Sequence, residues 1–348
     1  MPALKVGLLG CGTIAQSVHL RVLTHLPQSE LVAFADLDPH RREAARRCAP
    51  AAVACVDYED VLHMPNVNAV VICLPNALHA AATLRALQQG KHVYLEKPLA
   101  TNLDDGRRVL EAWRQTNLVG MMGFNGRFNP LYQKVKQCLQ AGWLGELVSV
   151  RSVFATAAQP CPAWKQIRQS GGGVLLDLAS HHVDLVRFFF AQAVSEVFAT
   201  LRSQHSEGDS ATLQLHLANG LLVQSFFSLH AVEEDRFEIY GQAGKLAVDR
   251  YLSLNVDVTA PTRDFARLKW LYAGLRSLLH IPYALDKIWA PGHEPSYRAA
   301  LAHFVAAVRA ERPASPDFED GYRSLVVIAA AEEAAASGRV AIPERHLE

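Results

Sequence analysis

Lys97, Asp177 and His181 are the residues of this sequence whose types and settings suit proton-transfer chemistry. Lys97 lies in Glu96-Lys97-Pro98, directly after the apolar run 92–95. A lysine at the end of a buried strand can hydrogen-bond a reacting oxygen and stabilise negative charge that develops on it. Pro98 restricts the local backbone and favours an extended conformation for the residue before it. A solvated lysine without a catalytic role is the alternative interpretation.

His181 lies four residues after Asp177 in a helix that we expect over 175–190. Residues at i and i+4 share one face of a helix, and Asp184 lies near the same stripe. An imidazole can remove a hydroxyl proton near neutral pH, and a neighbouring carboxylate could orient it or hold a substrate hydroxyl. The alternative is a polar stripe that only makes local pairs. His182 points elsewhere on the helix and is expected to be structural.

A glycine-rich turn near the N-terminus has the pattern of a dinucleotide-binding loop. Gly10-Cys11-Gly12-Thr13-Ile14-Ala15 fits G-x-G-x-x-A, follows a strand pattern and opens a helical one. The first glycine permits a tight turn, the second lets the backbone approach a pyrophosphate, and the small third residue allows close helix packing. The start of the helix adds N–H donors and partial positive charge. We expect the cofactor to bind at Gly10, Gly12, Thr13, Ile14 and Ala15.

Asp36 ends the second expected strand. A carboxylate there would accept hydrogen bonds from the adenosine ribose and repel a 2′-phosphate, which favours NAD over NADP. Arg41 and Arg42 are close enough in the sequence to weaken this preference. A glycine turn without a ligand, together with a solvated Asp36, is the alternative.

Short apolar runs alternate with helical patterns over the first 120 or so residues. Because the runs are continuously apolar, they predict strands covered on both faces, which is typical of a parallel sheet. The expected strands are 6–9, 31–35, 69–74, 92–95 and 118–122, and the expected helices are 39–48, 76–89 and 102–115. This alternation predicts a doubly wound α/β sheet of the Rossmann type.

Consecutive strand patterns with short turns follow from about residue 146. They predict an α/β domain with a large mixed or antiparallel open sheet. The expected strands are 147–154, 194–203, 212–217, 221–229, 237–240 and 246–248, and the helices are 129–140, 175–190, 295–311 and 318–337. We expect an NAD(P)-binding domain over 1–122 and a second domain over 123–348. The helix over 129–140 could belong to either, and the final helices could pack back on the first domain.

The composition argues against several classes of protein. Lys plus Arg and Asp plus Glu both number 34, so a net charge of zero gives no electrostatic footprint for nucleic acid. No signal-type segment opens the sequence and no run of about 18 uncharged apolar residues occurs, so we expect a cytoplasmic protein without a membrane span. The six cysteines include no C-x-x-C pair, which predicts free thiols rather than disulfides or a metal site.

The stretch 255–293 is longer than expected between a sheet strand and the next helix. Its apolar residues recur at helical spacing, with basic residues at other positions: Phe265, Leu268, Tyr272, Leu275 and Leu279, with Arg263, Arg267, Lys269 and Arg276. We expect an amphipathic helix packed on the domain or on a partner subunit. A lid over the substrate and a membrane-surface helix are the alternatives.

Several segments in combination resemble the signature of the glucose-fructose oxidoreductase/inositol dehydrogenase (Gfo/Idh/MocA) family. They are Pro75-Asn76 with His79, Gly90-Lys91-His92-Val93-Tyr94-Leu95-Glu96-Lys97-Pro98-Leu99-Ala100, the glycines before Asp177, His181 and Asp184, and Asp320-Gly321. The resemblance spans nearly the whole chain. It implies a Rossmann domain followed by an α/β domain for substrate binding, whose open sheet commonly mediates oligomers. A homodimer or homotetramer is therefore expected.

The resemblance also implies roles for individual residues. NAD(P) would lie over Lys97 and His181, with Lys97 assisting, His181 as the acid/base and Asp177 binding substrate or supporting proton transfer. The cofactor site would further include Pro75, Asn76, His79, Glu96 and Pro98. Trp164 and Lys165 would contact the substrate, although many sugar-oxidising members have Trp-Arg there. Ala179 stands where the family usually has glycine.

The activity implied is an NAD-dependent dehydrogenase that interconverts a ring hydroxyl and a ketone of a sugar, sugar derivative or inositol. One alternative is an NAD-dependent glycosidase, which oxidises its substrate transiently, eliminates the glycosidic substituent and returns the hydride. Another is a non-catalytic NAD-sensing regulator. The presence of Lys97, Asp177 and His181 argues against the regulator, because a sensor needs no proton-transfer group beside the nicotinamide.

Overall fold

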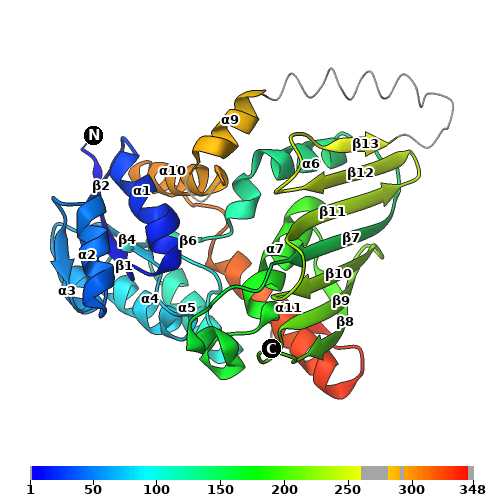
Figure 1. The fold of residues 1–348 in the computed structure, drawn as a ribbon, viewed down its shortest axis with the longest axis horizontal. Coiled ribbons are helices and arrows are strands. Elements are labelled where there is room, and N and C mark those ends of the chain that lie inside the picture. The colour runs from blue at the N-terminus through cyan, green and yellow to red at the C-terminus, as the bar shows by residue number, and fades with distance from the viewer. Residues whose placement is uncertain (1, 260–280, 291–293, 344–348) are drawn as a thin grey trace. The chain divides into compact units, whose positions relative to one another are not determined.

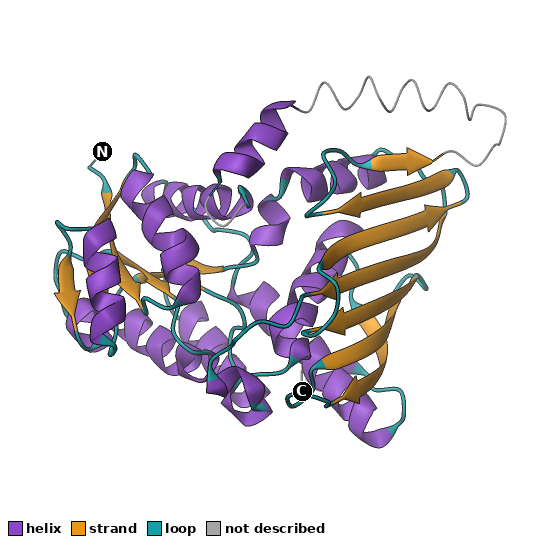
Figure 2. Cartoon of the chain, viewed as in Figure 1, coloured by secondary structure: helices purple, strands orange, loops and turns teal. Residues whose placement is uncertain are grey.

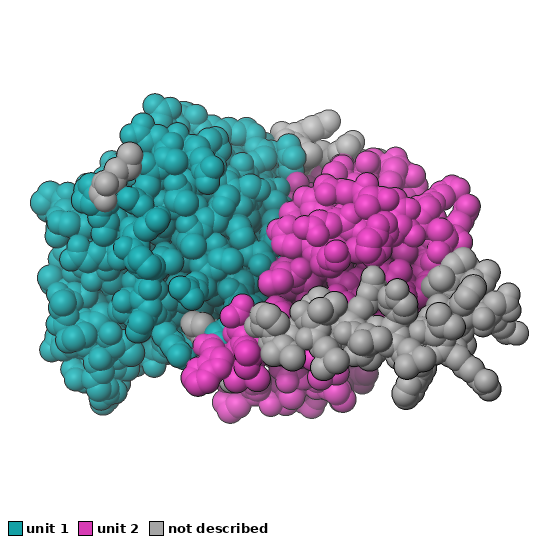
Figure 3. Space-filling model, turned by 90° about the horizontal axis from the view of Figure 1, so that it is seen from above, with its two compact units in different colours: residues 1–128, 169–171, 290–325 teal, residues 129–168, 172–289, 326–348 magenta. Residues whose placement is uncertain are grey.

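The chain forms two compact units, which are coloured separately in Figure 3. The computed structural model describes residues 2–259, 281–290 and 294–343. The first unit comprises Met1–Phe128, Gln169–Gly171 and Ala290–Leu325, and the second comprises Asn129–Arg168, Gly172–Trp289 and Val326–Glu348. The expected domain boundary at residue 122 stays a prediction.

A six-stranded parallel sheet forms the centre of the first unit (Figures 1 and 2). Its order is β3-β2-β1-β4-β5-β6, and every neighbouring pair is parallel. The strands are β1 (Leu4–Leu9), β2 (Ser29–Ala35), β3 (Val53–Cys55), β4 (Ala69–Ile72), β5 (His92–Leu95) and β6 (Gly120–Met122). This confirms the doubly wound fold. The sequence analysis does not predict β3, whereas β6, which is equally short, lies within the expected strand 118–122.

The predicted helices over 39–48, 76–89, 102–115 and 295–311 are present in this unit, together with short helices over 58–62 and 125–128 that the sequence analysis does not predict. In chain order, the helices are η1 (Ala15–His19) continuing as α1 (Leu20–His25), α2 (Pro39–Cys48), α3 (Tyr58–Leu62), η2 (Asn76–Leu78) with α4 (His79–Gln88), α5 (Leu103–Arg114), η3 (Asn125–Phe128) and α10 (Ser296–Arg309). Helix α2 begins where the Asp38 side chain accepts a hydrogen bond from the backbone N–H of His40, with Pro39 at its first position. The start of the first helix is a π-turn, in which the Leu20 N–H donates to the Ala15 carbonyl.

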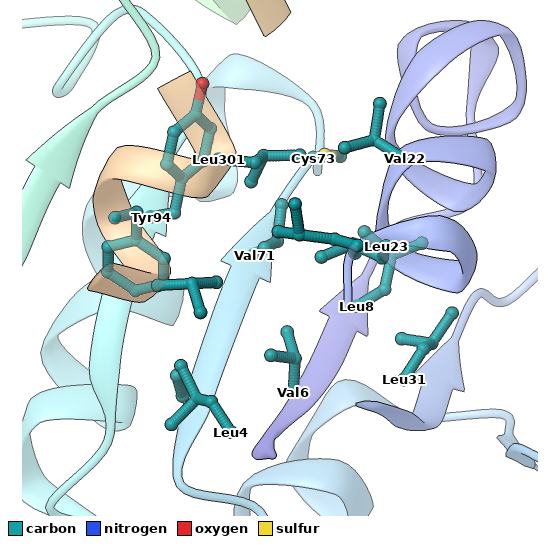
Figure 4. Packing of buried hydrophobic residues seen from close by; sticks show 14 of the residues in the cluster. Leu4, Val6, Leu8, Val22, Leu23, Leu31, Val71, Cys73, Tyr94 and Leu301 are labelled. Carbon is teal, nitrogen blue, oxygen red and sulfur yellow. The ribbon is translucent and has the colours of Figure 1, made fainter. Parts of the chain in front are cut away.

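The hydrophobic core of the first unit lies between its sheet and helices α1 and α10 (Figure 4). Leu8 of β1 and Val71 of β4 are fully buried on this face, and Leu23 of α1 packs over them. Leu301 of α10 and the ring of Tyr94 on β5 extend the same cluster. Burial of these residues fixes the first helix, and therefore the glycine turn before it, on the sheet.

A seven-stranded mixed sheet forms the second unit, as predicted. Its order is β13-β12-β11-β7-β10-β9-β8, and all neighbours are antiparallel except β7 and β10. The strands are β7 (Leu147–Ala155), β8 (Val194–Arg202), β9 (Ser210–Leu217), β10 (Leu222–Ser228), β11 (Glu234–Gly241), β12 (Gly244–Asp249) and β13 (Asp257–Thr259). The short edge strand β13 is not predicted from the sequence.

Helices α6 (Pro130–Gln140) and α7 (Ser180–Phe190) lie on one face of this sheet (Figure 1). Phe189 of α7 meets Phe237 of β11 edge to face, with ring centroids 5.3 Å apart. The predicted helix over 175–190 is present, but it starts as a π-turn, η6 (Leu175–Ala179), in which the Ser180 N–H donates to the Leu175 carbonyl. This wider turn rotates the side chains of Leu175–Ala179 away from the positions that they would have in a regular α-helix. The last helix, α11 (Phe318–Ser337), begins in the first unit and continues in the second.

The other face of the seven-stranded sheet is open to solvent. Along β9, for example, buried and exposed residues alternate strictly from Ala211 to Leu217. Phe198 and Phe226 on this face are 36% and 39% exposed. Glu238 is partly buried there, which opposes its ionisation, but hydrogen bonds from Lys245, Arg236 and Tyr240 lower the pKa of Glu238 to about 2. The open face therefore combines two aromatic side chains with a charged network.

Within 2–259, 281–290 and 294–343, no helix has the length and apolar character needed to cross a bilayer. The positions between 263 and 279 that predict an amphipathic helix lie outside the described residues. Helix α9 (Ile281–Trp289) follows them and exposes Ile288 and Trp289, by 66% and 74%.

Candidate active site

The glycine turn directly follows β1, where the expected dinucleotide site lies. Gly10 has φ +90°, and a Cβ on it would lie 2.6 Å from the Cys73 carbonyl oxygen. At Gly12 no heavy atom lies within 4 Å of the position that a Cβ would occupy. Ala15 is fully buried, and no side chain caps the helix that begins there. A turn that is tight at Gly10 and open at Gly12 fits a bound pyrophosphate.

Asp36 directly follows β2 and lies beside the glycine turn. One carboxylate oxygen accepts a hydrogen bond from the Cys11 N–H at 2.8 Å, and the other accepts from the Asp38 N–H at 2.9 Å. Arg42 donates to the backbone carbonyls of Asp36 and Leu37, at 2.7 and 2.9 Å. The Asp36 carboxylate is thus fixed at the strand end, where a ribose would lie, while the Arg42 guanidinium is held by backbone oxygens.

Glu96, Lys97 and Pro98 directly follow β5, and the Lys97–Pro98 peptide bond is cis. The buried ring of His79 lies between this segment and the one that follows β4. Its Nδ1 is 2.7 Å from the Pro98 carbonyl oxygen, and its Nε2 is 2.8 Å from the Leu74 carbonyl oxygen. Burial lowers the pKa of His79, although the contacts with both carbonyls oppose this shift. The ring therefore sets the spacing of two strand-end segments that are predicted to line the cofactor site.

Asn76, next to Pro75 at the end of β4, is also buried. Its side-chain amide donates to the Gly171 carbonyl at 2.8 Å. Gly171 has φ +93°, and a Cβ on it would lie 2.6 Å from the Cβ of Asn76. The first glycine of the Gly171-Gly172-Gly173 run is therefore needed for this close approach.

Glu96 makes a buried contact that the sequence does not reveal. Its Oε1 lies 2.7 Å from Nε2 of His19, whose side chain is fully buried at the end of η1. The two residues are 77 positions apart, and no local pattern links them. This pair joins the helix that follows the glycine turn to the residue that precedes Lys97.

Asp177 lies in the second unit, within the π-turn η6. Its carboxylate pairs with Nζ of Lys165 at 3.1 Å, and the two side chains are 22% and 39% exposed. The Lys165 ammonium also lies 5.7 Å from the centroid of the Trp164 ring. A Cβ on Gly172 would lie 2.1 Å from the Lys165 carbonyl oxygen. The absence of a side chain at Gly172 therefore lets the backbone of Lys165 lie close to the residues that precede η6.

His181 is the second residue of α7 and is partly exposed. Its ring centroid lies 5.9 Å from that of Phe154 on β7. The structure thus places Trp164, Lys165, Asp177 and His181 in the second unit and Lys97 in the first. The joint action of Lys97 and His181 on one substrate stays a prediction.

Asp320 and Gly321, which contribute to the family resemblance, have structural contacts. Asp320 pairs with the buried Arg127 at 3.0 Å, and a Cβ on Gly321 would lie 2.8 Å from the Met122 sulfur. They pack the start of α11 against the end of β6. In the described part of the chain, no group of three or more His, Cys, Asp or Glu residues is placed to hold a metal ion.

Two family models match most of the chain. One, described as an oxidoreductase family with an NAD-binding Rossmann fold, matches residues 4–124, and the other, the GFO/IDH/MocA C-terminal domain, matches residues 132–247. The chain belongs to the Gfo/Idh/MocA family. It is therefore an NAD-binding oxidoreductase of the sugar and inositol dehydrogenase type, which confirms the predicted family, fold class and cofactor.

Relatives and solved structures match this family member over almost its whole length. Myo-inositol 2-dehydrogenase of Thermotoga maritima is 25% identical over 339 residues, which are 95% of this chain and 96% of the relative. A levoglucosan dehydrogenase in complex with NADH and levoglucosan has a TM-score of 0.84 at 22% identity, covering 98% and 99% of the two chains. The WlbA dehydrogenase from Bordetella pertussis, in complex with NADH and UDP-GlcNAcA, has a TM-score of 0.83 at 22% identity and covers 98% of each chain.

The contrast between Gly10 and Gly12 gives a test of the cofactor site. Gly12→Ala should leave the thermal unfolding midpoint close to that of the wild type, because the added Cβ meets no protein atom within 4 Å. It should weaken NAD binding by about tenfold or more, since the methyl group would enter the space expected for the pyrophosphate. Gly10→Ala should instead lower the unfolding midpoint, because its Cβ would clash with the backbone. Calorimetric titration measures the NAD affinity and thermal melts measure the unfolding midpoint. Unchanged NAD affinity in Gly12→Ala would show that the pyrophosphate does not bind at this turn.

Proposed function

We propose that this enzyme interconverts a ring hydroxyl and a ketone of a sugar, sugar derivative or inositol. The observation that carries the proposal is the placement of Lys97 directly after β5, in the same parallel sheet whose strands β1 and β2 end at the glycine turn and Asp36. Ligands of such sheets bind beyond the carboxyl ends of the strands. Lys97 therefore lies at the edge of the sheet where the nicotinamide cofactor is expected.

Each candidate residue has a distinct chemical task in this proposal. When bound beside Lys97, NAD would supply the hydride acceptor for the carbon that carries the reacting hydroxyl. Lys97 donates a hydrogen bond to the reacting oxygen and stabilises the negative charge that develops on it. His181 accepts the hydroxyl proton as general base and returns it in the reverse direction. Asp177 holds a neighbouring hydroxyl of the substrate.

The ion pair between Lys165 and Asp177 supports a polyhydroxy substrate. The Lys165 ammonium donates hydrogen bonds and the Asp177 carboxylate accepts them. The two opposite charges lie 3.1 Å apart and neutralise each other. Neighbouring ring hydroxyls can both accept and donate, so they can replace parts of this pair without leaving a charge unbalanced. Relatives named for myo-inositol and levoglucosan act on compounds of this kind.

A substrate screen tests the proposed reaction and its alternatives. NADH formation at 340 nm should be seen with at least one member of a panel of inositols, free sugars, glycosides and nucleotide sugars. Release of a glycosidic substituent without net NADH formation would favour the glycosidase. No turnover across the panel, with NAD bound tightly, would favour the regulator.

The fixed carboxylate of Asp36 predicts a preference for NAD. The wild-type protein should bind NAD at least about tenfold more tightly than NADP, roughly 1.4 kcal/mol. Asp36→Ala should reduce this ratio, because it removes both the ribose acceptor and the repulsion of a 2′-phosphate. Arg46→Ala, which removes only an exposed pair with Glu43, should leave the ratio unchanged. Equal or tighter binding of NADP by the wild type, measured by calorimetry, would contradict the role of Asp36.

Replacement of Lys97 or His181 tests the catalytic assignments. Lys97→Ala and His181→Ala should each lower turnover by about 10²–10⁴-fold, the usual contribution of a group that transfers a proton or stabilises charge. NAD affinity should change little. Lys5→Ala and His63→Ala, at exposed positions of the first unit, are the matched controls and should keep wild-type turnover. Near-normal turnover in His181→Ala would show that this histidine is structural.

The open sheet face leads us to propose a homodimer or homotetramer. Phe198 and Phe226 would then be buried between subunits, since oligomer interfaces favour aromatic side chains. Light scattering at micromolar concentration should give a multiple of the 38.2 kDa chain mass. The double variant Phe198→Lys and Phe226→Lys should reduce that mass, whereas Leu37→Lys, at an exposed position of the first unit, should not. A monomeric wild type would rule out the proposed assembly.

A further inference from the structure

A buried polar cluster lies beside the candidate acid/base residue in the second unit. Asp235 of β11 is 2% exposed, and its Oδ1 accepts a hydrogen bond from the Tyr132 hydroxyl at 2.6 Å. Nε2 of His182 lies 3.0 Å from the same oxygen, and Nε of Arg250 lies 2.7 Å from Oδ2. Side chains from α6, from α7 and from the residue that follows β12 therefore converge on one carboxylate of β11. Neither the family resemblance nor the local sequence assigns a role to this cluster.

The charges in the cluster determine the form of the His182 side chain. Burial opposes ionisation of Asp235, but Arg250, His182 and Tyr132 outweigh it and hold the pKa of Asp235 well below its usual range. Burial lowers the pKa of His182, and the charge of Arg250 acts in the same direction. The hydrogen bond and the charge of Asp235 raise this pKa, but burial outweighs them. Asp235 and Arg250 neutralise each other, so a neutral His182 leaves no unbalanced charge in the interior. In this form Nε2–H donates to Asp235, and Nδ1 has no hydrogen-bond partner among the described residues.

This hydrogen bond is directional, whereas most other contacts of the His182 ring are not. The centroid of the His182 ring lies 4.3 Å from that of Phe237 and 5.5 Å from that of Phe227. The same ring stacks on Phe154, with centroids 5.4 Å apart. Aromatic surfaces of this kind stabilise a helix on a sheet but permit small shifts along it. The buried Nε2–H of His182 can donate to Asp235 from far fewer positions, because every shift leaves the carboxylate incompletely hydrogen-bonded.

Phe154 also connects the cluster with the neighbouring histidine. Its ring contacts both imidazoles, with centroids 5.9 Å from His181 and 5.4 Å from His182. The Arg250 guanidinium lies over the same ring at 5.3 Å. The two histidines are consecutive in the first turn of α7, so any shift of His182 moves His181 with it.

We infer that His182 is a positioning residue, whose hydrogen bond to Asp235 fixes the first turn of α7 and so places the His181 imidazole. The inference rests on the proposed role of His181 as acid/base. It extends that role to a residue that does not touch the substrate.

Two substitutions separate the hydrogen bond from the packing of the ring. His182→Phe keeps an aromatic ring among three phenylalanines but removes the N–H donor. His182→Gln removes the ring but keeps an N–H that can reach Asp235. His63→Phe, at an exposed position of the first unit, is the matched control.

The test measures the ring nitrogens of His181 directly and needs no substrate. Protein labelled with ¹⁵N-histidine and saturated with NAD is observed by two-dimensional ¹H–¹⁵N NMR, and the His181 signals are assigned by their loss in His181→Ala. His182→Phe should displace or broaden them, whereas His182→Gln and His63→Phe should leave them near their wild-type positions. If His182→Phe does not fold, His182→Leu takes its place. Unchanged His181 signals in the apolar variant, or equal displacement in the apolar and Gln variants, would overturn the inference.

Kinetics then distinguish failure of this inference from failure of the proposed function. With a substrate from the screen, His182→Phe should lower kcat by about 10- to 100-fold, the range expected for a misplaced catalytic group, and His182→Gln should restore most of it. In a His181→Ala background, His182→Phe should cause little further loss, because His182 acts through His181. An equal loss in both backgrounds would contradict the positioning role. Normal turnover in His181→Ala would instead refute the proposed function.

Discussion

Parallel pairing in the six-stranded sheet is the constraint on which the candidate active site depends. Strands β2, β1, β4 and β5 are consecutive neighbours, so their carboxyl ends lie along one edge although they come from distant parts of the sequence. The glycine turn, Asp36, Pro75-Asn76 and Lys97 each follow one of these strands. The His19–Glu96 pair and the His79 ring then tie these strand ends together from within. A site assembled in this way has its spacing set by backbone hydrogen bonds rather than by flexible loops.

The sequence predicts most of the fold because its local signals are strong. Buried strands appear as continuous apolar runs, and helix α2 is framed by Asp38-Pro39, a cap followed by a proline that starts the helix. Three edge strands have three residues each: β6 lies within the expected strand 118–122, whereas β3 and β13 are not predicted from the sequence. The π-turns at Ala15–His19 and Leu175–Ala179 are not predictable either, because an i→i−5 bond inserts one residue without altering the apolar pattern.

The candidate site could be proposed from the sequence where a local motif suggests the chemistry, whereas contacts that only the folded topology creates could not be foreseen. Gly10, Gly12 and Asp36 are recognisable because their spacing along the chain reflects the geometry of a bound dinucleotide. The partners of Glu96 and His182 lie 77 and 53 residues away, and only the folded sheets bring them close. The sequence analysis expects His182 to be structural, and in the structure its Nε2 lies 3.0 Å from the buried carboxylate of Asp235. In both units, a residue next to a candidate catalytic side chain is anchored by a buried pair of imidazole and carboxylate.

The central claim is that Lys97 and His181 act on the same substrate oxygen. An experimental structure of the enzyme with NAD and a substrate from the screen tests it most directly. We expect Lys97 Nζ and the His181 ring each to lie within about 3.5 Å of the reacting oxygen, or to reach it through one water molecule. If either residue lies more than about 8 Å away in the closed complex, proton transfer and charge stabilisation must come from other groups, and the roles proposed for Lys97 and His181 are wrong.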